Sequence, residues 1–196
     1  MTIKEIYELA KPVILRKLEN SLPPGLYYHC LSHTIDVEAQ AERISISENV
    51  LNEDDIYLLK IACLYHDSGF LYTYSDHEEM GCKIVKSQLP EIAASTEQLE
   101  MIFGLINATK IPQQPLTKLQ EIICDADLDY LGRDDFFAIS HELYKELKTK
   151  NIVSNEHDWN IIQVKFFKQH KYFTKSNKEL REQKKQMHLR MIEKML

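Results

Sequence analysis

The sequence predicts an all-α fold, a helical bundle in which a single domain spans residues 1–196. Apolar residues recur at steps of three and four along the chain, which is the period of helices that each bury one face, and no segment alternates as a strand does. Only five glycines interrupt this pattern. A chain of this length can bury a sizeable core in one domain, and no repeat or low-complexity tract divides it.

The first three helices are separated by breaks and caps. A helix over 3–20 ends before Pro23-Pro24-Gly25, because proline removes a backbone donor and glycine permits a turn. The apolar face at steps of three and four continues over 28–47. Asn52 precedes three acids and begins a helix over 53–67, since its side chain can accept hydrogen bonds from free amides.

Ser75, Ser95 and Thr117 begin the next three helices. Each stands three residues before Glu or Gln, which is the capping-box spacing that satisfies free backbone amides at a helix start. Pro90 and Gly132 interrupt the chain near two of the expected helix ends. The expected ranges are 76–89, 96–108 and 117–130.

The last three helices are expected over 134–149, 155–170 and about 176–194. Ser176, three residues before a glutamate, marks the start of the long C-terminal helix. We expect one narrow apolar stripe to dock this helix on the body while its cationic face meets solvent. The stripe consists of Leu180, Met187, Met191 and Met195.

Composition excludes several classes of protein. The net charge of −6 argues against an extended nucleic-acid partner, which clustered Lys and Arg would have to hold, but it allows a small anionic substrate. No apolar run approaches the ~20 residues that span a bilayer, and the N-terminus lacks the apolar block of a signal peptide. Four scattered cysteines form no Cys-x-x-Cys pair. We expect a cytoplasmic protein with free thiols and no membrane partner.

Two histidines share the expected buried face of the helix over 28–47. His29 and His33 are four residues apart and continue into Val37 on the same stripe. Imidazoles at this spacing can converge on a metal, or on a metal and a substrate. Histidines that merely pack in the core or are satisfied at the surface also occur at this spacing.

The pair His66-Asp67 ends the next helix. His66 continues the apolar stripe of that helix, so the pair is expected to be buried. Burying an imidazole beside a carboxylate is costly unless the two are paired or bind a cation. A second pair, His157-Asp158, stands at a helix start, where an acid is favourable because of the helix dipole, and we interpret it as structural.

Three acids end the helix over 117–130. Asp125, Asp127 and Asp129 oppose the helix dipole, and a nearby cation would remove that conflict. Spacing alone does not choose among them. His77 lies at another helix start with Gly81 one turn later, a place where an anion could bind, although a capped helix with an exposed histidine fits equally well.

Taken together, His33, His66-Asp67 and Asp127 resemble the signature of the HD-domain superfamily of metal-dependent phosphohydrolases, over the stretch 27–133. The resemblance implies a helical bundle of the HD-domain type with one divalent metal held by these four residues. In that superfamily the last ligand usually stands in an Ala-Asp-x-Leu context, whereas here Leu128 directly follows Asp127. Asp127 remains the best match because Ala126 precedes it.

A second, local resemblance concerns His29. The segment from Tyr28 to Val37 resembles the Tyr-His-Asn-x-x-His-x-x-Asp-Val segment of cyclic-nucleotide phosphodiesterases, with Cys30 in place of the Asn. There the first His donates a proton and the second binds metal, which implies a catalytic role for His29. Asp67 is the other expected catalytic residue and is also an expected metal ligand. Ala108-Thr109 resembles an Ala-Thr pair of the same enzymes.

One metal is implied. Some HD proteins carry two further histidines for a second metal before the last Asp, whereas here only His77 lies between. Manganese, iron, cobalt, nickel, zinc and magnesium are all compatible with the site, and two histidines favour a transition metal. His77, Thr109 and Arg133 are candidate substrate-binding residues, and for Arg133 the alternative is an ion pair with Asp129 or Asp134.

The expected function is metal-dependent phosphohydrolysis of a nucleotide or another small phosphate ester, as a phosphomonoesterase or phosphodiesterase. In this mechanism the metal activates water, His29 is the general acid, and Asp36 orients His33. The first alternative is a regulator that binds metal and nucleotide without turnover. The second is a helical interaction protein whose histidines only pack.

Overall fold

The computed structural model describes the backbone of residues 1–196 and the side chains of 1–89 and 91–196. Over these residues it contains nine α-helices and three short 3-10 helices. No β-strand occurs over this range, so the all-α prediction is confirmed. Within the same range, no helix combines the length and the apolar character needed to cross a bilayer. The elements are α1 Ile3–Ser21, α2 Leu31–Ser47, α3 Glu53–Tyr65, η1 Ser68–Leu71, α4 His77–Gln88, η2 Pro90–Ile92, α5 Thr96–Ala108, α6 Lys118–Asp127, η3 Asp129–Gly132, α7 Phe136–Thr149, α8 Glu156–Gln169 and α9 Lys175–Glu193.

Helix ends differ from the sequence-based expectation by up to three residues, and three of these differences lie at the candidate site. Helix α2 begins at Leu31 rather than at residue 28, because the preceding backbone is extended at Cys30 and the amides of Tyr28 and His29 bind a distant carboxylate. Helix α3 ends at Tyr65, so that His66 caps it. Helix α6 ends at Asp127, and the chain tightens into η3. All three changes fall where candidate ligands lie.

The capping predictions held for three helices and were wrong for two. Asn52, Ser95 and Thr117 each accept a backbone amide at the start of their helices. The cap of α4 is Asp76, in a left-handed conformation, instead of Ser75. Thr174 caps α9 instead of Ser176, whose own amide donates to the Glu48 carboxylate.

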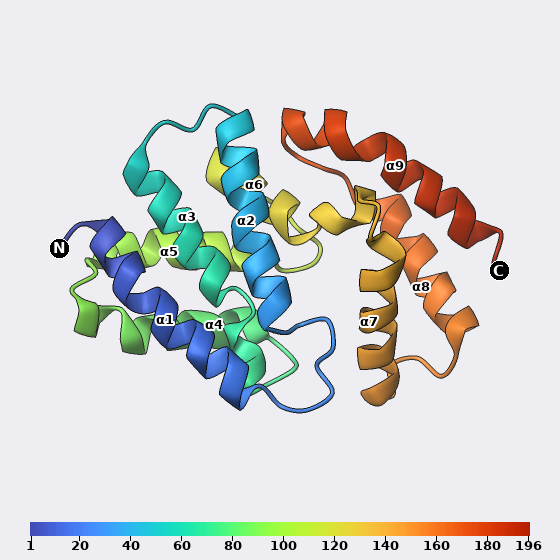
Figure 1. Cartoon of the computed structure of the whole chain (residues 1–196), viewed down its shortest axis with the longest axis horizontal. Helices are drawn as coiled ribbons and strands as arrows, with labels where there is room; N and C mark the ends of the chain where they lie inside the picture. Colours follow the sequence, from blue (N-terminus) through green and yellow to red (C-terminus); the bar gives the residue numbers. More distant parts are fainter.

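The first six helices enclose the main core. Helix α3 lies at its centre and packs against α1, α2 and α5, while α2 also packs against α6 and α5 against α4 (Figure 1). Each helix contributes side chains that are fully or almost fully excluded from solvent. Among them are Ile6, Ile14, Val37, Ile44, Leu59, Ile61, Val85, Ile102, Ile106, Ile122 and Ile123.

Helices α7, α8 and α9 form the other end of an elongated molecule, and the chain termini lie at opposite ends (Figure 1). Their core contains Phe136, Phe167 and Ile192, together with Leu131 from η3. Burial of these large apolar side chains is the main force that holds the three helices to η3. The expectation of one domain over residues 1–196 remains a prediction.

Helix α9 packs through polar residues, so the predicted apolar stripe was wrong. The side chains of Leu180, Met187, Met191 and Met195 are exposed. The buried face instead carries Asn177, Lys185 and His188, together with Leu189 and Ile192. Each of the three polar side chains finds a buried partner: Asp129 for Asn177, the His170 carbonyl for Lys185 and the Leu131 carbonyl for His188. Specific hydrogen bonds therefore determine which face of α9 packs against the body, and the spacing of apolar residues does not reveal them.

Gly132 permits the close packing of α9, and its replacement tests that contact. A Cβ at Gly132 would lie 2.4 Å from the carbonyl oxygen of Arg181, which belongs to the α9 backbone. We expect Gly132→Ala to lower the free energy of unfolding by about 1–3 kcal/mol through overpacking, measured by urea denaturation.

Gly104→Ala is the matched control. A Cβ at Gly104, inside α5, would meet only the flexible end of Gln120 at 3.4 Å. The same substitution there is expected to leave stability unchanged or to raise it by up to about 1 kcal/mol, because alanine is the better helix former. Equal effects of the two substitutions would contradict the close contact of η3 and α9.

Candidate metal centre

Three helices bring His33, His66 and Asp127 to one point in the interior. His33 lies in the first turn of α2, His66 caps the end of α3, and Asp127 is the last residue of α6. The two histidine Nε2 atoms are 3.4 Å apart. Asp127 Oδ1 lies 3.2 Å from the Nε2 of His33 and 3.7 Å from that of His66. The centre therefore joins three segments that are distant in the sequence.

Asp67 adds a fourth ligand candidate. Its Oδ2 lies 3.3 Å from the Nε2 of His33 and 3.3 Å from the Nε2 of His66. Among the described residues, no group donates a well-formed hydrogen bond to this buried oxygen. A buried carboxylate oxygen without a donor is costly, and a cation at this position would remove the cost.

The donor atoms fit one divalent cation. His66 Nδ1 is 2.8 Å from the Cys63 carbonyl, which can only accept, so this nitrogen carries a proton and Nε2 is the atom that can offer a lone pair to a metal once it is deprotonated. Ligands bound at about 2.0–2.2 Å to one ion lie roughly 3.0–3.5 Å from one another. The distances around the centre are close to that range. The ligand atoms of His33, His66 and Asp127 all lie within 4.8 Å of one another.

Glycines allow the segments around the centre to approach one another. A Cβ at Gly69 in η1 would lie 1.9 Å from the carbonyl oxygen of His77, and one at Gly81 in α4 would lie 2.8 Å from that of Tyr65. Helix α4 can therefore pack directly against the segment that contains the His-Asp pair. This contact brings His77 Nε2 within 3.4 Å of Asp67 Oδ1.

His29 lies beside the centre and is oriented by Glu146. Because α2 begins only at Leu31, His29 is not on the helix with His33, and that part of the sequence prediction was wrong. Its Nδ1 is 2.5 Å from Oε1 of Glu146, a carboxylate of α7 that is fully buried. The amides of Tyr28 and His29 donate to the other carboxylate oxygen, at 3.0 and 3.1 Å.

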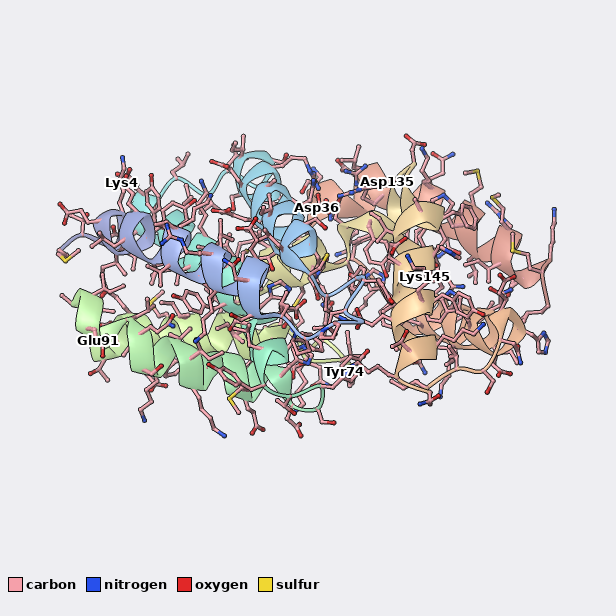
Figure 2. All side chains as sticks on the ribbon, turned by 60° about the horizontal axis from the view of Figure 1, so that its bottom comes forward. Lys4, Asp36, Tyr74, Glu91, Asp135 and Lys145 are labelled. Atoms are coloured by element: carbon pink, nitrogen blue, oxygen red, sulfur yellow. The ribbon has the colours of Figure 1, made fainter. Side chains whose placement is uncertain are left out.

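Tyr74 completes the surroundings of Glu146. It lies at the junction of the two groups of helices, near α7 (Figure 2). Its hydroxyl donates to Glu146 Oε1 at 3.0 Å. Burial raises the pKa of Glu146, but the hydrogen bonds and charge of His29 outweigh burial and lower it, so the carboxylate stays ionised.

Sequence reasoning missed Glu146, although a signal existed. It lies three residues after Leu143 and seven after Ile139, on the apolar stripe of its helix. A glutamate at a core-facing position requires a partner. The sequence alone does not identify His29, 117 residues earlier, as that partner.

His77 and Thr109 line the same cavity as His29, Asp67 and Asp127. The ring of Phe70 stacks on His29 and also on His77, with centroid distances of 4.3 and 4.0 Å. The hydroxyl of Thr109 donates to the Ile106 carbonyl. The structure thus places both of these substrate-binding candidates beside the metal centre.

The structure does not bring Arg133 to this cavity. Its guanidinium forms ion pairs with Asp36 at 2.7 Å and with Asp135 at 2.6 Å, and Asp129 lies 3.8 Å away. The ion-pair alternative therefore describes Arg133, with Asp36 and Asp135 as its main partners rather than Asp134. Asp36 is engaged by Arg133 and Gln40, so the expectation that it orients His33 finds no contact among the described residues.

Comparison with known proteins assigns the family. The model of the HD domain matches residues 30–129, about half of the chain, and this range includes all four converging residues. The chain belongs to the HD domain family. The HD domain places it in a superfamily of metal-dependent hydrolases.

A solved structure shares the fold of this HD domain protein. It is a predicted HD superfamily hydrolase from an uncultured Thermotogales bacterium, with a TM-score of 0.60 and 19% sequence identity. The match covers 98% of this chain and 90% of the other. It therefore extends beyond the HD domain into α7, α8 and α9. No curated protein sequence matches the chain significantly.

The pKa values of the candidate ligands link metal binding to proton release. Burial lowers the pKa of His33, but the carboxylates of Asp127 and Asp67 outweigh it and raise that pKa to about 9. Burial raises the pKa of Asp127, and the two imidazoles outweigh it and lower that pKa to about 2. Without a cation, the protons therefore reside on the imidazoles at neutral pH.

Metal binding to the HD domain should release protons. A metal needs a neutral imidazole, whereas His33 is protonated in the metal-free protein below about pH 9. The apparent affinity for Mn²⁺ is expected to rise with pH, by up to about tenfold per unit for each proton displaced, and to level off once both imidazoles are deprotonated. Calorimetry at pH 7 in buffers of different ionisation enthalpy measures the release. Binding without proton release would contradict the predicted state of His33.

Proposed function

We propose that this HD domain protein is a metal-dependent phosphohydrolase acting on a small phosphate ester. The observation that carries the proposal is the arrangement of four side chains around one point. Among their atoms is the buried Oδ2 of Asp67, which accepts no well-formed hydrogen bond from the described residues. His33, His66, Asp67 and Asp127 would hold one divalent cation. When bound, the cation would supply a water of lowered pKa and would neutralise charge on the phosphoryl group.

The chain's own residues provide the remaining chemistry. With Nδ1 of His29 occupied by Glu146, its Nε2 is the atom left to give a proton to the leaving oxygen. Glu146 is a positioning residue: it fixes the ring through Nδ1 and the backbone through two amides. His77 and Thr109 would contact the substrate, a role supported by their position in the wall of the cavity.

Two nitrogen and two oxygen donors favour a transition metal over magnesium, and manganese, iron, cobalt, nickel and zinc all suit such a set. One ion is proposed, because the ligand atoms of His33, His66 and Asp127 enclose one position. A nucleotide as the substrate, and the choice between monoester and diester, remain predictions.

Substitution of the ligands and of the proton donor should have different effects. We expect His66→Ala and Asp67→Ala to lose both metal and activity, since each removes a ligand. His29→Ala is expected to keep the metal and to lower turnover by about 10²–10⁴-fold, because only the proton donor is lost. Elemental analysis and a phosphatase assay with added Mn²⁺ separate the two classes.

His157→Ala is the control for the ligand variants, since His157 belongs to the His-Asp pair at the exposed start of α8. It should retain both metal and activity. Bound metal without hydrolysis of any phosphate ester would favour the regulator instead. Absence of metal from protein purified without chelator, with no loss of stability when chelator is added, would favour the interaction protein.

Glu146→Gln tests the positioning of His29. The variant keeps an oxygen acceptor but loses the charge, and we expect it to lower kcat by about 10–100-fold with little change in metal content. The loss should be large for an alkyl phosphate and small for 4-nitrophenyl phosphate, because nitrophenolate leaves without a proton. Glu142→Gln, one turn earlier and half exposed, is the control. An equal loss of kcat for both substrates would indicate that Glu146 has only a structural role.

A further inference from the structure

A cavity of about 250 Å³ leads from the metal centre to the α7–α8 end of the molecule. Its inner wall contains His29, Asp67, His77 and Asp127, the residues of the proposed site. The remainder of the wall comes mainly from η3, α7 and α8. A substrate phosphate at the metal centre would therefore have its organic group in this space.

Away from the metal centre the wall is apolar. It consists largely of hydrocarbon and aromatic side chains, represented by Leu131, Phe136, Leu143, Leu147, Trp159 and Phe166. The polar groups that α7 and α8 contribute among the described residues are the indole N–H of Trp159 and the amide of Gln163. The Gln163 amide is engaged: Oε1 accepts from Ser140 at 2.6 Å and Nε2 donates to Asn160 at 3.1 Å. The wall thus offers a ligand surface to pack on and few polar partners.

The charges of the cavity limit the ligand further. No Lys or Arg is among the described lining residues, and three acids, Asp67, Glu78 and Asp127, lie at its inner end. One phosphate can be neutralised at the metal centre, but further phosphates would meet no Lys or Arg among the described lining residues. Ribose hydroxyls and a nucleobase would lose water in the apolar part without replacing its hydrogen bonds, which is unfavourable.

We propose that the substrate is a phosphate ester of an apolar alcohol, whose alkyl or aryl group occupies this cavity. The inference rests on the proposed function and narrows its substrate class. In the reaction, water oxygen bonds to phosphorus, the bond from phosphorus to the alcohol oxygen breaks, and that oxygen takes a proton from His29.

The sole tryptophan, Trp159, lies in the cavity wall and supplies a direct readout. We would titrate n-alkylphosphonates from ethyl to octyl, which cannot be hydrolysed, into Mn²⁺-loaded protein and follow Trp159 fluorescence. The dissociation constant is expected to fall about fourfold per added methylene until the cavity is full. A dissociation constant independent of chain length, or tighter binding of a nucleoside 5′-monophosphate than of hexylphosphonate, would overturn the proposal.

Two cavity variants and a surface control locate the binding. Leu147→Gln, in the wall, should abolish most of the chain-length dependence, and Leu143→Phe, which stays apolar but fills space, should shorten the longest chain that binds well. Leu9→Gln makes the first change on the exposed face of α1 and should leave the dependence intact. The proposal fails if all three variants behave like the parent.

Turnover assays separate this inference from the function on which it rests. Hydrolysis of butyl, hexyl and octyl phosphate with kcat/KM rising along the series supports both proposals. Hydrolysis of phosphate esters without any dependence on chain length overturns the substrate class alone. Chain-length-dependent binding of phosphonates without hydrolysis of any ester overturns the phosphohydrolase and leaves an apolar ligand site beside the metal centre.

Discussion

The structure depends on the burial of two imidazoles and two carboxylates within a few ångströms of one another. The residues concerned are His33, His66, Asp67 and Asp127, all mostly excluded from solvent. Charges so placed must be compensated locally, by protons on the imidazoles or by a cation. The ends of α2, α3 and α6 therefore have to meet with defined geometry, and the apolar core around them provides the rigidity.

Much of this arrangement could be predicted from the sequence, because it is expressed in local patterns. Periodicity and caps located the helices within a few residues. The position of His66 on an apolar stripe distinguished the pair His66-Asp67 from the exposed pair at His157. The choice among the three acids of α6 and η3 needed the fold. Asp127 faces the histidines, whereas Asp125 accepts hydrogen bonds from Thr174 at the start of α9 and Asp129 accepts them from Asn177 and Arg181 of α9.

What the sequence could not provide are contacts between distant segments. The carboxylate of Glu146 and the ring of His29 meet only because α7 packs against the turn before α2. The apolar wall of the cavity likewise combines η3, α7 and α8, whose leucines and aromatics are ordinary core residues when each helix is considered alone. Helix α9 was misjudged because its buried face is polar, and hydrogen-bond partners leave no periodic trace.

The hydrogen bonds of Glu146 have a consequence for how this protein can diverge. All four proposed ligands lie within the 30–129 match, whereas the group that orients the proton donor comes from α7, outside it. In the proposed mechanism, the metal ligands and the group that orients the proton donor are thus encoded in separate stretches of the chain. Under the proposed function, substitutions in the last third of the chain could change the turnover rate or the organic group of the substrate while the metal ligands stay the same.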